Sequence, residues 1–410
     1  MTTPRPERIL VIGGGYAGVL CANRLAGRLG SRARITLVNP IEPFVERVRL
    51  HEVAARTDAE PATRHSLRSL LRPSVGLRIA RVTRIRPDAH RVDGVEGAEN
   101  RPWTDHYDTL VYAVGSGVPV GAVPGAAEHA HNISSLEAAQ ALRRRLAQLS
   151  DDASVLIVGG GATAIELVTE LASRRPSLRL SIVTSSRLAP TLSVKARRYL
   201  EQAQAMSYVD VVEHTPVTEV TRTGVRTDQG EELAADCVVW AASFAVPTLA
   251  RDSGLEVDRS GRLVVDECLR TARHPDILGA GDGSVILGPS GATLRMACAT
   301  AIPQGGHAAA TVIAGLEGRS PEPFALAYLV LAMSLGPGDG LVQRTRFDDT
   351  PSGTVLTGRP AAAFNELNTR YARSVLAWER TRAGAYRWAK PPTSARREGR
   401  RRSGRRRLRI

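Results

Sequence analysis

The stretch that decides the fold is ILVIGGGYAG at residues 9–18, where four apolar residues run directly into a G-x-G-x-x-G turn. The apolar run predicts a buried strand, and apolar residues at helical spacing over 17–29 predict a helix after the turn. In such a turn the first glycine permits the tight bend, the second lets the chain approach phosphate, and the third lets helix and strand pack closely. The amide groups and the positive end of the helix can then bind a pyrophosphate, although a single turn of this kind could be only a loop.

A second copy of the pattern lies at residues 155–164, VLIVGGGATA, with alanine in place of the third glycine. The apolar spacing that follows predicts a helix over 163–172. A third motif, DILGAGDG at residues 276–283, places an aspartate after a Gly-Ala-Gly turn. Two glycine turns in order, each between a strand and a helix, together with the aspartate motif, predict that the protein binds two nucleotides.

The duplication predicts an α/β fold with two Rossmann-like dinucleotide-binding domains, the second inserted into the first. One domain is expected to comprise residues 1–120 and 261–320, and the other residues 121–260. A smaller C-terminal region, 321–390, and a basic tail, 391–410, follow. The remaining patterns predict a hairpin at 77–85 and 90–95, strands at 109–114 and 178–184, and helices at 135–149 (N-capped by Ser134), 194–205 and 293–315.

The composition indicates a protein with an ample core and no membrane-spanning segment. The chain has 410 residues, 43% of them hydrophobic, and no apolar run approaches the roughly 18–20 residues of a membrane helix. The amino terminus, MTTPRPER, leads directly into the first strand, so no signal peptide is expected. The four cysteines have neither C-x-x-C nor zinc-type spacing, which argues against a redox disulfide and a metal site. We therefore expect a cytoplasmic protein.

The net charge of +14 is concentrated at the carboxyl end, where residues 391–410 hold nine arginines and one glutamate. We expect this tail to be disordered and able to attract anionic lipid. It lacks interleaved aromatic residues that would stack on bases, so no specific nucleic acid is expected. Before the tail, five apolar side chains recur near helical spacing: Phe364, Leu367, Tyr371, Val375 and Trp378. This helix could make a peripheral membrane contact, pack in the core or form a homodimer, and these alternatives stay open.

With these motifs in order, the chain resembles the two-dinucleotide-binding-domain flavoproteins, the pyridine nucleotide-disulfide reductase superfamily, and within it the type II NADH dehydrogenase-like branch. The resemblance covers residues 8–320 and implies FAD in the first domain and NADPH or NADH in the second. It further implies hydride transfer from NAD(P)H to FAD, and then electron transfer to a quinone-like or other small-molecule acceptor. The alternative is an FAD-dependent tailoring oxidoreductase or monooxygenase of small-molecule biosynthesis, and a third is a non-catalytic nucleotide sensor.

The resemblance also implies roles for particular positions. Ala113-Val114-Gly115 matches the A-T-G turn of the family's FAD domain, and Asp282 would bind a ribityl hydroxyl. Residues 295–305 look like the family's Ala/Gln-rich helix beside the isoalloxazine and the quinone site. Glu166, after the second glycine turn, is similar to a glutamate that lies near the nicotinamide and flavin. Cys298 has no partner thiol and is expected to be a small buried apolar residue.

Two strand ends depart from the family pattern, which has a carboxylate for the adenosine ribose. The first strand end carries Asn39, whose amide can still bond ribose hydroxyls but without charge assistance. The second is followed by Ser185, Ser186 and Arg187, and hydroxyls with an arginine accommodate a 2′-phosphate. The sequence therefore favours NADPH, and a solvated Arg187 with either coenzyme is the alternative.

The segment 44–52 contains the remaining candidates, since it occupies a region that passes close to the flavin in related proteins. Arg47 and Arg49 could neutralise reduced flavin or hold pyrophosphate, and His51 could be a proton source. If the segment is helical, its alternating charges could instead be a salt-bridged face. The expected catalytic residues are thus Glu166, His51 and Arg49. The expected cofactor-binding residues are Gly13, Gly15, Tyr16, Ala17, Gly18, Asn39, Arg47, Val82, Ala113, Gly115, Gly159, Gly161, Ala162, Thr163, Ser185, Arg187, Ala242, Gly281, Asp282 and Ala299.

Overall fold

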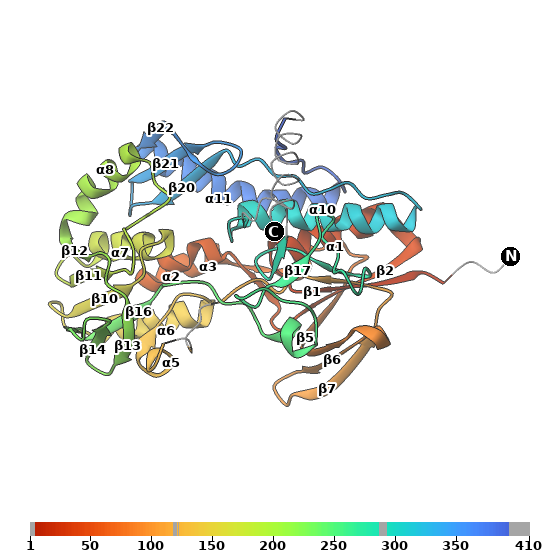
Figure 1. The fold of residues 1–410 in the computed structure, drawn as a ribbon, viewed down its shortest axis with the longest axis horizontal. Coiled ribbons are helices and arrows are strands. Elements are labelled where there is room, and N and C mark those ends of the chain that lie inside the picture. Colours follow the sequence, from red (N-terminus) through yellow and green to blue (C-terminus); the bar gives the residue numbers. More distant parts are fainter. Residues whose placement is uncertain (1–4, 118–120, 122, 287–292, 393–410) are drawn as a thin grey trace, which may run out of the picture.

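The computed structural model describes residues 5–117, 121, 123–286 and 293–392. These residues form two lobes side by side, with the C-terminal elements lying along one face of both (Figure 1). The tail expected at 391–410 lies outside the described residues except for its first two positions. Within the described part, no helix combines the length and apolar character needed to cross a bilayer.

A seven-stranded sheet in the order β18-β8-β1-β2-β5-β6-β7 forms the first lobe. The strand β1 (Glu7–Ile12) pairs in parallel with β2 (Ala33–Asn39) and with β8 (Thr109–Tyr112). Next to β8 lies β18 (Ile277–Gly279), so the chain returns to this sheet after building the second lobe. On the other side follow β5 (Gly76–Arg86), β6 (Arg91–Glu96) and β7 (Arg101–His106). The antiparallel pairing of β5 with β6 is the hairpin that the sequence predicted.

Two helices, α1 (Tyr16–Leu29) and α10 (Cys298–Leu316), lie side by side on one face of this sheet (Figure 1). Their backbones approach so closely that a Cβ on Gly305 would lie 2.2 Å from the carbonyl oxygen of Ala17. Leu20 and Leu25 of α1 are fully buried in the core below. This close packing fixes the start of α10 beside the first glycine turn.

A five-stranded parallel sheet in the order β12-β11-β10-β16-β9 forms the second lobe. Its strands are β9 (Ala130–His131), β10 (Ser154–Val158), β11 (Arg179–Val183), β12 (Val209–Val212) and β16 (Cys237–Trp240). The helices of the lobe are α6 (Leu136–Ala147), α7 (Ala162–Arg174) and α8 (Val194–Gln202). A small antiparallel sheet adds β13 (Val217–Thr221), β14 (Gly224–Thr227) and β15 (Glu232–Ala234).

Both large sheets place the strand before a glycine turn between two parallel neighbours. In the first lobe, β1 lies between β2 and β8, and in the second, β10 lies between β11 and β16. The predicted fold class, two Rossmann-like dinucleotide-binding domains, is confirmed by this arrangement.

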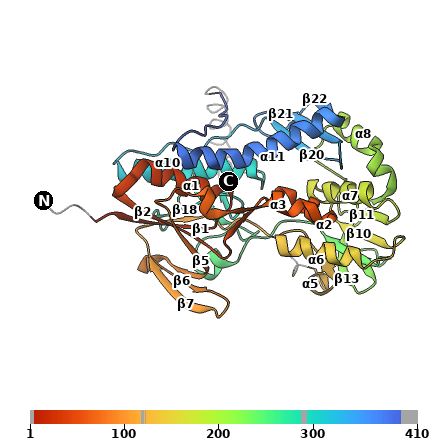
Figure 2. The ribbon, with the colours of Figure 1, turned by 180° about the vertical axis from the view of Figure 1, so that it is seen from behind.

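The C-terminal region consists of β20 (Val330–Ser334), β21 (Gly340–Thr345), β22 (Pro351–Thr357) and the long helix α11 (Gly358–Thr381). Seen from behind, α11 runs from above α1 to the three-stranded sheet over the second lobe (Figure 2). A buried ion pair between Glu379 and Arg24 fixes α11 to α1. At the other end, the Tyr199 hydroxyl donates a 2.7 Å hydrogen bond to Asp339, which joins α8 to the turn after β20. The region therefore ties the two lobes together.

The remaining elements are short. They are β3 (Pro43–Val45), β4 (Arg64–Ser66), β17 (Leu263–Val265), β19 (Ser284–Ile286), α2 (Leu50–Ala55), α3 (Glu60–Thr63), α4 (Leu67–Leu70), α5 (Ala126–His129) and α9 (Leu249–Asp252). Short 3-10 helices occupy Gly30–Arg32, Arg47–Arg49, Thr57–Ala59, Pro87–Ala89 and Gln204–Tyr208.

Three predicted helix boundaries were wrong. The N-cap of α6 is Ser135, whose hydroxyl accepts from Ala138 N, because the Ser134 hydroxyl is bonded to Asn132. The helix expected from residue 293 begins at Cys298, because the chain before it is extended and Arg295 is held by Asp349. The helix expected over 194–205 ends at Gln202, and a 3-10 helix follows.

Candidate flavin and nucleotide sites

The first glycine turn is shaped by backbone contacts that leave its outer side open. Gly13 has a φ of 109°, and a Cβ there would lie 2.1 Å from the carbonyl oxygen of Ala113. A Cβ on Gly18 would lie 1.9 Å from the carbonyl oxygen of Gly13. By contrast, Gly15 at the start of α1 has no atom within 4 Å of its Cβ position. The turn is therefore closed toward the sheet and open at the N-terminus of α1, where a phosphate would bind.

Asn39 holds this turn in place through both ends of its side-chain amide. Its Oδ1 accepts a 2.8 Å hydrogen bond from Gly14 N, and its Nδ2 donates a 2.7 Å bond to the carbonyl oxygen of Ile41. A carboxylate could not donate the second bond. Asparagine at this strand end therefore adds a tether to the following loop, while Oδ1 keeps a second lone pair for a ribose hydroxyl.

Four separate segments meet beyond the turn, at the place expected for the flavin. Asp282 accepts a 2.7 Å hydrogen bond from the Ser116 hydroxyl, and Arg47 donates a 2.6 Å bond to the Ser116 carbonyl oxygen. Gly281, with a φ of 80°, donates its N–H to the Gln304 side chain over 2.7 Å. Ala299, on the first turn of α10, is exposed. The aspartate motif, the turn after β8, the segment after β3 and α10 thus converge.

These residues fit FAD. Burial lowers the pKa of the Arg47 guanidinium, and Asp282 partly opposes the effect. Arg47 makes a single hydrogen bond within the part of the chain that the structure describes. A desolvated cation with so few partners is suited to an anionic group such as reduced flavin or pyrophosphate. Gly115, with a φ of 72°, has only this guanidinium near its Cβ position, at 3.8 Å.

Three further predicted cofactor residues lie near this site or on its lobe. Tyr16 packs edge-on against Phe44 with ring centroids 5.1 Å apart, and its buried hydroxyl has no hydrogen-bond partner among the described residues. Ala17, beside it, is buried and lies against Gly281. Val82 is half-buried in β5 and packs against the core of the first lobe. The unpartnered hydroxyl of Tyr16 is available to a ligand.

The second glycine turn repeats the geometry of the first. Gly159 has a φ of 134°, and a Cβ there would lie 2.8 Å from the carbonyl of Ala241 and 2.9 Å from Ala242 N. Gly161 has open space at its Cβ position, and Ala162 and Thr163 begin α7 beside it. The loop with Ser185 and Arg187 is exposed. The positions predicted to bind a nucleotide in the second lobe therefore gather around the N-terminus of α7.

Glu166 lies on α7 at the boundary between the lobes. Its Oε1 accepts a 3.1 Å hydrogen bond from Ser334 N, at the end of β20. The Nδ1 atom of the buried His51, on α2, lies 4.0 Å from Oε2. Burial raises the pKa of Glu166, and His51 and the Ser334 bond partly oppose the rise. Two of the predicted catalytic residues, Glu166 and His51, are thus brought together from α7 and α2, which are far apart in the chain.

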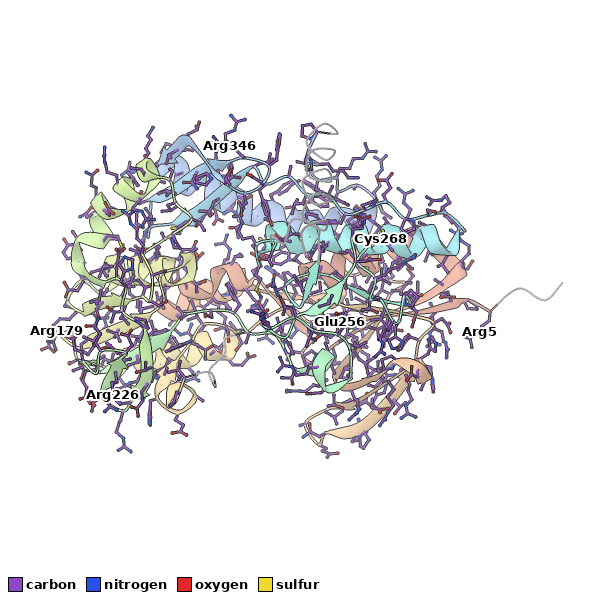
Figure 3. All side chains as sticks on the ribbon, in the orientation of Figure 1. Arg5, Arg179, Arg226, Glu256, Cys268 and Arg346 are labelled. Atoms are coloured by element: carbon purple, nitrogen blue, oxygen red, sulfur yellow. The ribbon has the colours of Figure 1, made fainter. Side chains whose placement is uncertain are left out.

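Arg49 contacts three carboxylates. Its guanidinium lies 3.4 Å from Glu46, 2.9 Å from Glu52 and 2.6 Å from Glu366. Its charge is balanced by these partners, which is the salt-bridged arrangement that the sequence left open as the alternative. The arginines labelled in Figure 3 (Arg5, Arg179, Arg226 and Arg346) lie instead at the outer edges of the molecule.

A polar cavity of about 290 Å³, which sequence reasoning missed, lies next to His51. It is open to solvent on one side and is lined by α2, α7, the turn between β20 and β21, and α11. Its charged lining residues are Arg49, Glu52, Arg56, Glu170, Arg174 and Glu366. These residues come from three distant segments, so no local pattern in the sequence indicates the cavity.

Cys298 stands at the start of α10, beside the converging segments. Burial raises the pKa of its thiol to about 11. Cys21, Cys237 and Cys268 are free as well. A thiol with so high a pKa is a poor nucleophile at neutral pH. Cys298 packs against the core of the first lobe, but it is half-buried, whereas the sequence predicted a buried residue.

The comparisons with known proteins agree with one another. A sequence profile of the pyridine nucleotide-disulphide oxidoreductase family matches residues 7–305. An NADH dehydrogenase-like protein of Mycobacterium tuberculosis is 31% identical over 387 residues, which cover 88% of this chain and 93% of that protein. A type II NADH:quinone oxidoreductase of Staphylococcus haemolyticus is 27% identical over 391 residues, covering 88% of this chain and 94% of that protein. The structure of NDH2 from Plasmodium falciparum in complex with NADH superposes with a TM-score of 0.77 at 15% identity, over 93% of this chain and 99% of that one.

Proposed function

Because this chain belongs to the pyridine nucleotide-disulphide oxidoreductase family, we propose that it is an FAD-dependent NAD(P)H dehydrogenase that passes electrons to a quinone-like small molecule. The observation that carries the proposal is the pair of open glycine turns, at Gly15 and Gly161, on two sheets with the same strand pairing. The relatives named as NADH dehydrogenase-like and as NADH:quinone oxidoreductase support it.

Several of the predicted cofactor residues have a role in this proposal. The turn at residues 13–18 would bind the pyrophosphate of FAD, and Asp282 would bind a ribityl hydroxyl. When bound, FAD supplies the group that accepts hydride from NAD(P)H and returns electrons to the acceptor. Arg47 would balance the negative charge that reduction adds, since it is desolvated and has one hydrogen bond. The turn at residues 159–161 would bind the pyrophosphate of the nicotinamide coenzyme.

Reduction of a quinone-like acceptor to its diol takes up one proton from solvent in addition to the hydride of NAD(P)H. His51 and Glu166 would carry this proton. His51 lines the polar cavity, which has room for water, and it faces Glu166 over 4.0 Å. Because burial raises its pKa, Glu166 binds a proton more readily near neutral pH than an exposed glutamate does. Arg49 would keep the wall of this cavity in shape through its three ion pairs.

The acceptor would approach near the start of α10. Tyr16 offers a buried hydroxyl without a partner in the described part of the chain, and Cys298 contributes an apolar surface beside it. Most members of the apolar series expected on α11 are exposed: Phe364, Leu367, Tyr371 and Trp378, but not Val375. We call these four exposed side chains the α11 apolar face, and we propose that it makes a peripheral contact with a membrane that contains a lipid-soluble acceptor.

The test is an anaerobic titration of the purified protein, followed by its visible spectrum. Addition of NADPH or NADH should bleach the flavin absorbance, and a water-soluble quinone should restore it. Protein that binds no flavin after reconstitution, or whose flavin neither coenzyme reduces, would contradict the proposal. Rapid turnover that needs oxygen and an organic substrate would instead support the tailoring oxidoreductase.

A further inference from the structure

The pairing of the strands assigns equivalent positions to the two nucleotide sites. Ile12 pairs with Val38 and Val158 pairs with Val183, each at the end of its strand. The first glycine of each turn then donates to the carbonyl oxygen of that partner over 2.8 Å, Gly13 to Val38 and Gly159 to Val183. The residue after the partner is Asn39 in the first lobe and Thr184 in the second. The position of the second site that is equivalent to Asn39 is therefore Thr184, the last residue of the strand that the sequence predicted at 178–184.

The contacts of the middle glycines support this equivalence. A Cβ on Gly14 would lie 2.9 Å from the Asn39 side chain, and a Cβ on Gly160 would lie 2.5 Å from the Thr184 hydroxyl. Thr184 is buried. The position from which a carboxylate would bind the coenzyme ribose, and repel a 2′-phosphate, thus carries a small neutral side chain.

The loop after Thr184 folds back onto the glycine turn. Ala189 N donates a 2.8 Å hydrogen bond to the carbonyl oxygen of Gly160. The residues between them, Ser185, Ser186 and Arg187, are exposed, whereas Leu188 and Ala189 are buried. The loop therefore presents two hydroxyls and a guanidinium next to the expected adenosine end of the coenzyme.

The electrostatics of this loop favour an anion. The Arg187 guanidinium makes no hydrogen bond or ion pair with a described residue, and the Arg187 carbonyl oxygen accepts a 3.3 Å hydrogen bond from the Ser186 hydroxyl. Below it, Arg197 is buried and donates to the carbonyl oxygens of Leu188 and Ala189. The carboxylate that touches the loop is Glu213, and its Oε1 already accepts a 2.7 Å hydrogen bond from Leu188 N. One free guanidinium, one buried guanidinium and one engaged carboxylate leave the exposed side of the loop positive.

We propose that the second nucleotide site selects NADPH over NADH, with Arg187 and the hydroxyls of Ser185 and Ser186 binding the 2′-phosphate. The proposal rests on the proposed function, because it names the coenzyme of that site. A guanidinium pairs with phosphate through short, charge-assisted hydrogen bonds. Because the Arg187 guanidinium has no ion pair with a described residue to break, no free energy is lost in freeing it for the phosphate.

Calorimetric titration with two mononucleotides tests the proposal without turnover. The flavin-loaded protein is titrated with 2′,5′-ADP and with 5′-AMP, which differ only in the 2′-phosphate. We expect 2′,5′-ADP to bind about 10- to 100-fold more tightly, as one or two charge-assisted bonds would give. Arg187→Ala should reduce this ratio to about threefold or less. Arg222→Ala removes an exposed arginine of the same lobe that also lacks a described partner, and it should leave the ratio unchanged.

A second variant tests the preference for the 2′-phosphate without removing a binding group. Ser185→Glu adds a carboxylate at an exposed position, so the fold should be kept, which the flavin content and unfolding temperature would verify. Ser185→Glu should weaken the binding of 2′,5′-ADP more than the binding of 5′-AMP. Equal binding of the two nucleotides by the natural chain, or an unchanged ratio in Arg187→Ala, would overturn the proposal. That failure differs from failure of the proposed function, in which neither NADPH nor NADH reduces the flavin.

Discussion

The Nδ1 atom of His51 lies 4.0 Å from Oε2 of Glu166, although the two residues are far apart in the chain. His51 is on α2, next to the polar cavity, and Glu166 is on the second turn of α7, whose N-terminus faces the coenzyme site. The pair therefore connects a volume that can hold water with the boundary at which the two nucleotides are expected to meet. Its two members can be tested by different measurements.

Replacing His51 with glutamine should slow reoxidation of the reduced flavin by a quinone about 100-fold, because the group that passes the proton is lost. Reduction of the flavin by NAD(P)H should change little, since that step takes up no proton from solvent. Stopped-flow absorbance measures the two half-reactions separately. His106→Gln, at an exposed position on β7, is the control. Equal slowing of both half-reactions would argue for a structural role of His51.

Glu166→Gln should stabilise the folded protein at alkaline pH, where the natural chain must hold a buried carboxylate at this position. Burial raises the pKa of Glu166 in the folded state, so the protonated form is the favoured one there. The favourable contribution of this proton is complete below the pKa of an exposed glutamate and is lost as pH rises through the raised pKa. The amide keeps an acceptor for Ser334 N without the charge.

Thermal unfolding of the natural chain and of Glu166→Gln should therefore show a difference in unfolding temperature that is small at acidic pH and grows as the pH rises through the raised pKa of Glu166. Glu256→Gln, on the first lobe and away from the pair, serves as a control, and its effect should not follow this trend. A difference that shrinks with rising pH would mean that Glu166 is stabilised as a carboxylate.

Arg47→Ala should weaken FAD binding by about 10- to 100-fold, the cost of losing a charge-assisted contact to an anionic ligand. Arg47→Lys keeps the charge but not the planar guanidinium, so its affinity for FAD should lie between that of the natural chain and that of Arg47→Ala. Dissociation constants for FAD come from reconstitution of apoprotein followed by flavin fluorescence. Arg259→Ala removes an exposed arginine elsewhere on the chain and should have no effect. Unchanged FAD affinity in Arg47→Ala would place the flavin away from Ser116.

The fold could be predicted from the sequence because each glycine-turn motif predicts a strand, a turn and a helix together. The strand, the turn and the helix at residues 9–29 are all present, and the same is true at 155–172. The family that the motifs resembled is confirmed by the match over residues 7–305. The division into domains at residues 120, 260 and 320 stays a proposal, as do the roles of the site residues.

Other features required the structure. Ser134 and Ser135 are equally good caps in the sequence, and only the bond from Ser134 to Asn132 separates them. The equivalence of Thr184 to Asn39 depends on strand pairing between Val158 and Val183, which a linear pattern does not contain. The polar cavity depends on how α11 crosses both lobes, and long-range packing of this kind leaves no local signal.

Leu367→Ser should reduce binding to lipid vesicles if the α11 apolar face contacts a membrane. Leu367 is 65% exposed, so the folded state should lose about 0.5 kcal/mol or less. Val194→Ser, at a side chain that is 77% exposed on α8, is the matched control and should bind vesicles as the natural chain does. Sedimentation with anionic vesicles measures both variants, and a 1–390 truncation separates the tail from the helix. If the truncation alone abolishes binding and Leu367→Ser has no effect, the tail is responsible.

Two alanine substitutions in one turn should separate folding from FAD binding. Gly13→Ala places a Cβ 2.1 Å from the Ala113 carbonyl oxygen at a φ of 109°, so β1 and β8 must move apart or the turn must change. We expect a destabilisation of about 3 kcal/mol or more, together with loss of FAD. Gly15→Ala has open space and a φ of −81°, so the apoprotein should keep its unfolding temperature. Its Cβ would extend toward the phosphate, however, and FAD affinity should fall. Calorimetry gives the unfolding temperature of each apoprotein, and FAD titration gives the FAD affinity of each variant. A Gly15→Ala variant that binds FAD normally would mean that the pyrophosphate does not lie over the N-terminus of α1.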